Sequence, residues 1–231
     1  MLASWYDEQG PAADVLQVGE LPDPTPGPGE VRVRVTVSGV NPGETKKRRG
    51  WLGSAQGVLG AVGSLAAQLA HWDGATMIGT VRRTADLDLV DTTAVAHAVA
   101  LDGTDPAAAI RSYAPDGVHR VIEVALSDNA NLDCAVVRND AITAAYATRD
   151  ARPQLPFWPL LFNNVTPRML GSDDFPAEVK RQAARDLTAA AATGALTVET
   201  GARYPLNDIA KAHDHVEAGI HGRVLVDVPR P

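Results

Sequence analysis

The sequence predicts an α/β protein, with a doubly wound parallel sheet in the middle of the chain and a smaller β-rich unit beside it. After residue 57, short β-branched runs alternate with apolar helix-like stretches, and this alternation favours crossover connections and a parallel sheet covered on both faces. Before that point, residues 30–40 alternate apolar and polar side chains, as a half-buried strand does. Hydrophobic residues make up 45% of the 231 residues, enough for one sizeable core or two closely coupled lobes.

The β-rich unit is predicted from the first part of the chain. Residues 22–29 are rich in proline and glycine, and they favour a surface loop because proline lacks a backbone donor and fixes φ. Valines then stand at alternate positions from Val31 to Val37. This pattern predicts a half-buried, antiparallel strand over residues 30–40.

The middle of the chain has a sequence pattern that predicts alternating helices and strands. The predicted order is a helix over 60–72, strands over 75–81 and 96–101, a helix over 106–113, and strands over 118–124, 141–147 and 165–170. An alanine-rich stretch over 177–192 predicts the longest helix, with Glu178, Arg181 and Arg185 on its exposed side. A closing strand over 222–228 is predicted to return to the β-rich unit or to the sheet.

Composition argues against several classes of partner and setting. With 28 acidic and 21 basic residues, the chain gives no reason to expect nucleic acid or an anionic membrane, so a small molecule is the expected ligand. Cys134 is the single cysteine, which excludes an intrachain disulfide and a Cys-rich zinc site and fits a reducing cytoplasmic setting. We expect its side chain to be a buried, inert thiol. We expect neither a signal peptide nor a membrane span, because no window reaches roughly 20 continuous apolar residues.

Glycines stand at the entrance to the first predicted helix. In a dinucleotide-binding turn, such glycines let the backbone approach a pyrophosphate, which free N–H groups at the helix start then hold. The alternative is an ordinary turn with close-packing glycines. The candidate cofactor-binding residues here are Gly57, Gly60, Ala61, Val62 and Gly63.

Two arginines, Arg82 and Arg83, end the strand predicted over 75–81. An acidic residue at this place in a dinucleotide-binding fold accepts hydrogen bonds from the ribose 2′-hydroxyl of NAD. Two arginines instead offer positive charge to the 2′-phosphate of NADP. NADPH is therefore the predicted cofactor, and the alternative is a solvated loop that happens to be basic.

Three segments together carry a family resemblance: residues 38–46, 57–83 and 162–172. In this order they resemble the zinc-independent, zeta-crystallin-like quinone oxidoreductase branch of the medium-chain dehydrogenases/reductases. The resemblance implies a truncated GroES-like region over 1–55, a Rossmann domain over 56–172, and C-terminal helices and a strand over 173–231 that return to the GroES-like region. It also implies a homodimer that passes hydride from NADPH to a quinone or an activated enone.

The resemblance further implies residues near the reactive end of the cofactor. Asn41 would lie near the nicotinamide, with Ala145 and Tyr146 at the end of a strand and Phe162 and Asn163 in the loop that follows. Asn41 and Tyr146 are the candidate catalytic residues. Taken alone, Asn41 before a proline is also a good turn residue, and Tyr146 is equally suited to be a buried strand aromatic.

The sequence departs from this family between Ser54 and Ala55, where most of the catalytic domain and the first Rossmann strand are missing. The missing part includes the region that holds metal ligands in zinc-dependent relatives, so we expect no metal. Either residues 51–56 form a makeshift strand or the sheet is rearranged. The function therefore has two alternatives: a catalytically silent NADPH-binding scaffold, or a non-redox isomerase or cyclase that uses the remodelled cleft.

One histidine pair invites a metal interpretation. His213 and His215 are two positions apart in a predicted helix, so their side chains point away from each other and cannot chelate one ion. The expected place for both is a solvated helix face.

Overall fold

The computed structural model describes residues 1–50, 58–171, 174–220 and 222–229. The chain forms two compact units: unit 1 contains Met1–Gly53 and Val198–Pro231, and unit 2 contains Ser54–Thr197. The sequence placed the second boundary after residue 172, whereas the structure places it after Thr197. Gln68 explains the difference, because its buried side chain donates to the carbonyl of Thr197 (3.2 Å) and accepts from the Thr197 backbone N–H (2.7 Å).

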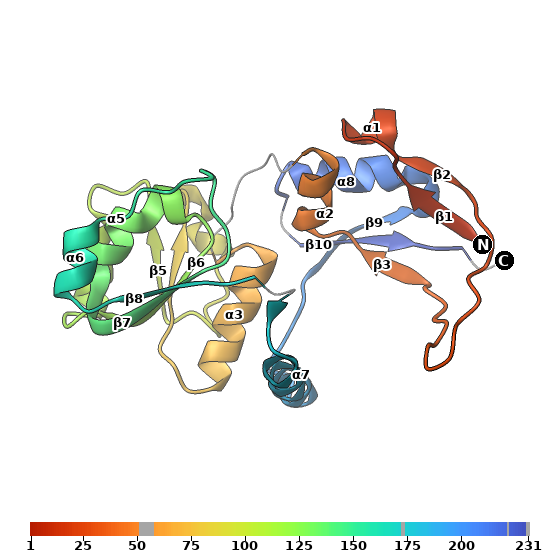
Figure 1. Cartoon of the computed structure of the whole chain (residues 1–231). Coiled ribbons are helices and arrows are strands. Elements are labelled where there is room, and N and C mark those ends of the chain that lie inside the picture. Colours follow the sequence, from red (N-terminus) through yellow and green to blue (C-terminus); the bar gives the residue numbers. More distant parts are fainter. Residues whose placement is uncertain (51–57, 172–173, 221, 230–231) are drawn as a thin grey trace. The chain divides into compact units, whose positions relative to one another are not determined.

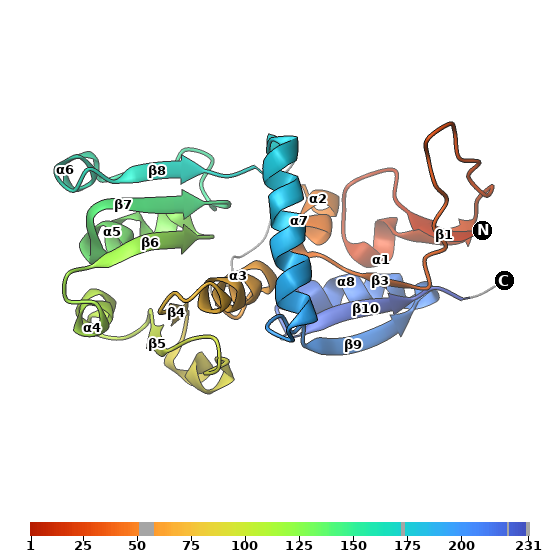
Figure 2. The same ribbon diagram turned by 90° about the horizontal axis from the view of Figure 1, so that it is seen from below.

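Unit 2 contains the predicted parallel strands (Figure 2). Strand β4 (Ile78–Val81) pairs with β5 (His97–Ala100), and β7 (Val137–Ala145) lies between β6 (Val118–Glu123) and β8 (Thr166–Met169), all in parallel. Among the described residues, no strand joins the β4–β5 pair to the β6–β7–β8 group. The makeshift strand considered for residues 51–56 lies outside the described residues. Directly after them, the Val58 backbone N–H donates to the Thr80 carbonyl of β4 (3.1 Å).

Helices cover both faces of the β4–β5 pair. Helix α3 (Ala61–Trp72) packs on one face of β4 and β5, and α4 (Pro106–Tyr113) with α5 (Leu126–Val136) packs on the other. Successive residues of β5 show this directly, because Val99 belongs to the cluster under α4 while its neighbour Ala98 belongs to the cluster under α3. Cys134 on α5 is buried, as predicted.

Local signals set the ends of some of these helices. Helix α4 begins after Asp105, whose carboxylate accepts from the Ala108 backbone N–H (2.9 Å), with a proline in its first turn. Helix α7 (Ala177–Ala192) carries Glu178, Arg181 and Arg185 on its exposed side, as predicted, and there the Glu178 carboxylate pairs with both arginines. Two further helices of unit 2 are short: the 3-10 helix η1 (Thr84–Leu89) and α6 (Phe157–Phe162).

Unit 1 is the β-rich unit, and the strand near the C-terminus joins it, which is one of the two places predicted for that strand (Figure 1). Strand β1 (Leu2–Trp5) pairs antiparallel with β2 (Gln17–Glu20). Strand β10 (Arg223–Asp227) lies between β3 (Val37–Gly39), which is antiparallel to it, and β9 (Thr200–Pro205), which is parallel. Its helices are α1 (Ala12–Val15), α2 (Pro42–Arg48), η3 (Leu206–Asp208) and α8 (Ile209–Glu217). No helix in the described part of the chain is long and apolar enough to cross a membrane.

The long strand predicted over residues 30–40 is wrong for most of its length. Only β3 is a strand, whereas Val31 and Val33 leave 83% and 73% of their surface exposed. An alternating pattern buries one face only where a neighbouring strand extends along it. Among the described residues, no strand pairs with residues 31–35, so these valines stay in solvent.

The apolar core of unit 1 lies between α8 and the β3–β10–β9 sheet, and a charged group is buried between α2 and α8. Arg48 is fully buried, and its guanidinium donates to the Gly10 carbonyl, to the Glu217 carboxylate and to Nδ1 of His213 (3.4 Å). Arg49 adds a second bond to Glu217 (2.6 Å). The contacts with His213 and Glu217 join the end of α2 to α8, and the contact with Gly10 joins α2 to the turn before α1, so the network connects separate parts of the sequence.

The prediction that the two histidines of α8 lie on a solvated helix face is also wrong. His213 is only 7% exposed, and its ring accepts from Arg48. His215 is partly buried, and its Nδ1 lies 2.9 Å from the Tyr204 hydroxyl. Hydrogen-bond partners from α2 and β9 replace water at one nitrogen of each ring, which favours burial of the rings. Burial lowers the pKa of His213.

Candidate functional site

Several charged and polar side chains of unit 2 lie at or just after the carboxyl ends of its strands. Arg82 and Arg83 follow β4, Asp102 follows β5, Glu123 is the last residue of β6, and Tyr146 follows β7. In open α/β sheets, ligands bind outside the carboxyl ends of the strands. The fold therefore puts charged and polar side chains where such a ligand is expected.

The N-terminus of α3 is free of side-chain caps. Gly60 is the N-cap residue, with an extended backbone and no capping side chain. The N–H groups of Ala61, Val62 and Gly63 lie in the first turn, where an α-helix provides no carbonyl partners for them. Together with the positive end of the helix dipole, they suit an anion such as a diphosphate. Gly57, the other glycine of the predicted turn, lies outside the described residues.

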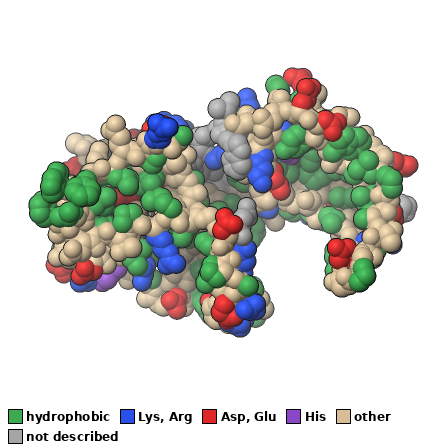
Figure 3. Space-filling model, in the orientation of Figure 1, with side chains coloured by type: hydrophobic (Ala, Val, Ile, Leu, Met, Phe, Trp, Pro, Cys, Tyr) green, Lys and Arg blue, Asp and Glu red, His purple; other side chains and the backbone are tan. Residues whose placement is uncertain are grey.

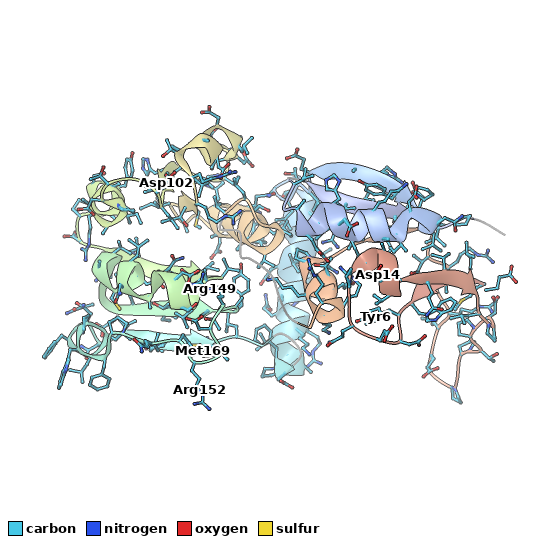
Figure 4. The ribbon with its side chains drawn as sticks, turned by 90° about the horizontal axis from the view of Figure 1, so that it is seen from above. Tyr6, Asp14, Asp102, Arg149, Arg152 and Met169 are labelled. Carbon is cyan, nitrogen blue, oxygen red and sulfur yellow. The ribbon has the colours of Figure 1, made fainter. Side chains whose placement is uncertain are left out.

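The two arginines after β4 have different surroundings. Arg83 donates to both oxygens of Asp86, from Nε to Oδ2 (3.0 Å) and from Nη2 to Oδ1 (2.7 Å). This bond holds the pKa of Asp86 below its ordinary value. Arg82 is exposed and makes no hydrogen bond or ion pair with any residue that the structure describes. Asp102 (Figure 4) accepts from both the backbone N–H and the hydroxyl of Thr84 at 2.8 Å, which anchors the loop after β4 to the end of β5.

A buried carboxyl pair lies at the end of β6. Glu123 is 5% exposed and accepts from the Ala125 backbone N–H and from Nδ2 of Asn129 (3.1 Å). Asp133 of α5 is 6% exposed, and burial, together with the charge of Glu123, raises its pKa to about 8. Asp133 is therefore expected to keep its proton at neutral pH, beside the Glu123 carboxyl.

Tyr146 lies next to this pair. Its backbone N–H donates to the Glu123 carbonyl (3.0 Å). Burial first, and then the negative charge of Glu123, raise the pKa of the Tyr146 phenol to about 12. The phenol is therefore a neutral hydrogen-bond donor at physiological pH. Ala145, which precedes it, is a buried residue at the end of β7.

The structure does not bring Phe162 and Asn163 to Tyr146. They precede β8, and the Asn163 carbonyl accepts from the Asp140 backbone N–H (2.8 Å) near the start of β7. Tyr146 follows the other end of β7, six residues farther along, which corresponds to roughly 20 Å of extended chain. Because β7 and β8 are parallel, a residue before β8 lies at the amino edge of the sheet, where α6 is also found (Figure 2).

Asn41, the other catalytic candidate, belongs to unit 1. It begins α2, and the Glu44 carboxylate accepts from its backbone N–H (2.6 Å) and from its Nδ2 (3.2 Å). Its Oδ1 accepts from Arg223 of β10 (2.7 Å). These contacts fit the interpretation of Asn41 as a turn and capping residue. Among the described residues, no group of three or more His, Cys, Asp or Glu side chains is placed to hold a metal ion.

Sequence reasoning missed four carboxylates of this site. Glu123 and Asp102 each follow a β-branched or apolar run, and that position alone marks the carboxyl end of a parallel strand. Asp86 stands three residues after Arg83, a spacing that brings side chains together in a helical turn. Asp133 gave no comparable signal, because its importance depends on contact with Glu123.

No family model and no curated protein matches the chain, but solved structures match nearly its whole length. The mycobacterial protein Rv1454c in complex with NADPH has a TM-score of 0.81 and 18% identity, covering 98% of this chain and 99% of that chain. An NAD-dependent alcohol dehydrogenase (TM-score 0.81, 15% identity) covers 99% and 100%, and the CurK enoyl reductase (TM-score 0.81, 14% identity) covers 99% of each. The chain therefore has the fold of the medium-chain dehydrogenases/reductases, a Rossmann-like sheet with a GroES-like β-rich unit.

Proposed function

We propose that this chain is an NADPH-dependent oxidoreductase that reduces a quinone or an activated enone by hydride transfer. One observation carries the proposal: helix α3 starts at an uncapped glycine, and the next strand, β4, is followed by Arg82, a cation that pairs with no described residue. A helix start of this kind suits a diphosphate, and a cation after the following strand suits a 2′-phosphate. The solved structures with this fold include an NADPH complex and an enoyl reductase.

The residues of unit 2 fit the parts of this cofactor. The N–H groups of Ala61, Val62 and Gly63 would hold the diphosphate, and Arg82 would face the 2′-phosphate. NADPH, when bound, supplies the hydride. The neutral phenol of Tyr146 would donate a hydrogen bond to a carbonyl oxygen at the end of β7, where it would stabilise negative charge that develops on that oxygen.

A second candidate is an NADPH-binding protein without turnover. The observation that favours it is the state of Asn41, whose amide oxygen and nitrogen are already engaged by Arg223 and Glu44. To contact a nicotinamide, Asn41 would have to give up at least one of these bonds. The two candidates share the cofactor site and differ only in chemistry.

We also propose a second copy of this chain as the protein partner. Aromatic side chains of α6 are largely exposed, with Phe157 at 62%, Trp158 at 63% and Phe162 at 72%, and hydrophobic side chains gather on this part of the surface (Figure 3). The neighbouring strand β8 pairs only with β7 within the described residues. An open strand edge beside an apolar patch suits edge-to-edge pairing of two identical sheets.

Light scattering tests this pairing, and the wild-type chain should have twice the mass of one chain. The double variant Trp158→Ser with Phe162→Ser should have the mass of one chain. A monomeric wild type would refute this pairing.

A titration followed by a turnover assay tests the function. NADPH and NADH are titrated by fluorescence, and loss of NADPH absorbance is then followed with a small quinone and with an unsaturated ketone. Tighter binding of NADPH and turnover of either acceptor would support the reductase. Binding without turnover would support the second candidate, and a folded sample that binds neither nucleotide would refute both.

A further inference from the structure

We propose that Asp86 sets the cofactor preference of this site by holding Arg83 in an internal salt bridge, which leaves Arg82 as the cation that faces the 2′-phosphate. The inference rests on the proposed function, because it concerns the same nucleotide site. It assigns different roles to two arginines that the sequence presents as a pair.

The geometry of η1 produces the salt bridge. Arg83 is its N-cap residue, and Asp86 follows three positions later, so their side chains come together in one 3-10 turn. The Asp86 backbone N–H also donates to the Arg83 carbonyl (2.9 Å), which closes the turn. The Arg83 guanidinium donates to both oxygens of the Asp86 carboxylate. The Arg83 side chain is 67% exposed, whereas only 13% of the Asp86 side chain is exposed. Arg83 therefore covers the carboxylate from solvent.

The charges around the loop make Arg82 the effective cation. Arg83 and Asp86 neutralise each other, and the nearby Asp102 adds negative charge while its Oδ1 is held by Thr84. Arg82 lies close enough to Asp86 for its charge to help lower the pKa of that carboxyl, yet it forms no ion pair with any described residue. Among the described residues of this loop, Arg82 is therefore the one whose charge is left uncompensated for an incoming phosphate.

This arrangement predicts an unusual result for Arg83. Its removal would uncover the Asp86 carboxylate beside the 2′-phosphate, and like charges at this distance repel each other. Arg83→Ala should therefore weaken NADPH binding by adding repulsion, and the additional removal of Asp86 should restore binding. A direct contact between Arg83 and the phosphate would not be restored in this way.

The test is a set of dissociation constants for NADPH and NADH, measured by fluorescence on the full chain. Arg82→Ala should weaken NADPH by about tenfold to a hundredfold, the loss expected for one charged hydrogen bond. Arg83→Ala should weaken NADPH by about fivefold, Arg83→Ala with Asp86→Ala should return to within about threefold of wild type, and Asp86→Asn should tighten NADPH by up to about fivefold. Every variant should leave NADH within about twofold of wild type.

A matched control comes from α7, where Arg181 pairs with Glu178 at the same three-residue spacing. Arg181→Ala, alone or with Glu178→Ala, should change neither dissociation constant.

Two kinds of failure are distinguishable. A folded wild type that binds no NADPH would overturn the proposed function and this inference with it. A wild type that prefers NADPH, together with a double variant as weak as Arg83→Ala alone, would leave the proposed function standing and overturn the role of Asp86. Should Arg83→Ala fail to fold, Asp86→Asn decides, because unchanged or weaker NADPH binding in that variant contradicts the inference.

Discussion

A single proton on Asp133 is expected to make the stability of unit 2 fall as pH rises. Asp133 lies buried on α5 against the buried carboxylate of Glu123. Burial first, and then the charge of Glu123, raise its pKa to about 8 from an ordinary value of 3.8. Between these two values the folded chain keeps a proton that the unfolded chain has released. The contribution to stability is therefore complete below about pH 4 and is lost as pH rises toward about 8.

The expected magnitude follows from one proton. Within this window the free energy of unfolding falls by up to about 1.4 kcal/mol per pH unit. Between about pH 6 and about pH 7.5 the loss is about 2 kcal/mol. Asp133→Asn keeps the shape of the side chain and a hydrogen-bond donor toward Glu123, but it cannot titrate. The variant should therefore lose this part of the pH dependence.

Urea unfolding of both proteins, followed by far-UV circular dichroism across this pH range, measures the difference. Subtracting the variant from the wild type removes the contributions of all other groups. Asp128→Asn is the matched control, because Asp128 lies on the same helix but is exposed and paired with Arg149. The control should keep the wild-type slope. A variant Asp133→Asn with the same slope as wild type would refute a buried proton at this position.

Three further changes test other parts of the structure. Arg48→Ala removes a buried cation and leaves Glu217 without that partner, so the free energy of unfolding, measured by thermal unfolding, should fall by about 3–5 kcal/mol. The control Arg49→Ala removes an exposed partner of the same carboxylate and should lower it by at most about 1 kcal/mol. Equal losses would contradict the network. Gly79→Ala places a Cβ 2.9 Å from Cγ1 of Val95 and should lower the urea midpoint by the equivalent of about 1–3 kcal/mol, whereas Gly171→Ala meets nothing within 4 Å and should change it little. Tyr146→Phe should lower kcat by about tenfold or more while leaving the dissociation constant of NADPH within about twofold; unchanged turnover would remove Tyr146 from the mechanism.

The sequence by itself determined the local elements and the class of fold. The helix predicted over 106–113 has those bounds in the structure, because Asp105 and Pro106 fix its start with contacts inside one turn. The β-branched runs became parallel strands, since their length and their alternation with helices leave few other arrangements. The glycine before α3 and the arginines after β4 were visible for the same reason, as each is a property of a few neighbouring residues.

Tertiary structure decided every feature that depends on a distant partner. Val31 and Val33 have a strand pattern but stay exposed, because no described strand pairs beside them. His213 is buried because Arg48, far away in sequence, supplies a donor to its ring, and Asn163 lies at the amino edge of the sheet because of the parallel pairing of β7 with β8. Pairing and burial are long-range properties that no short window of sequence contains, so only the folded chain reveals them.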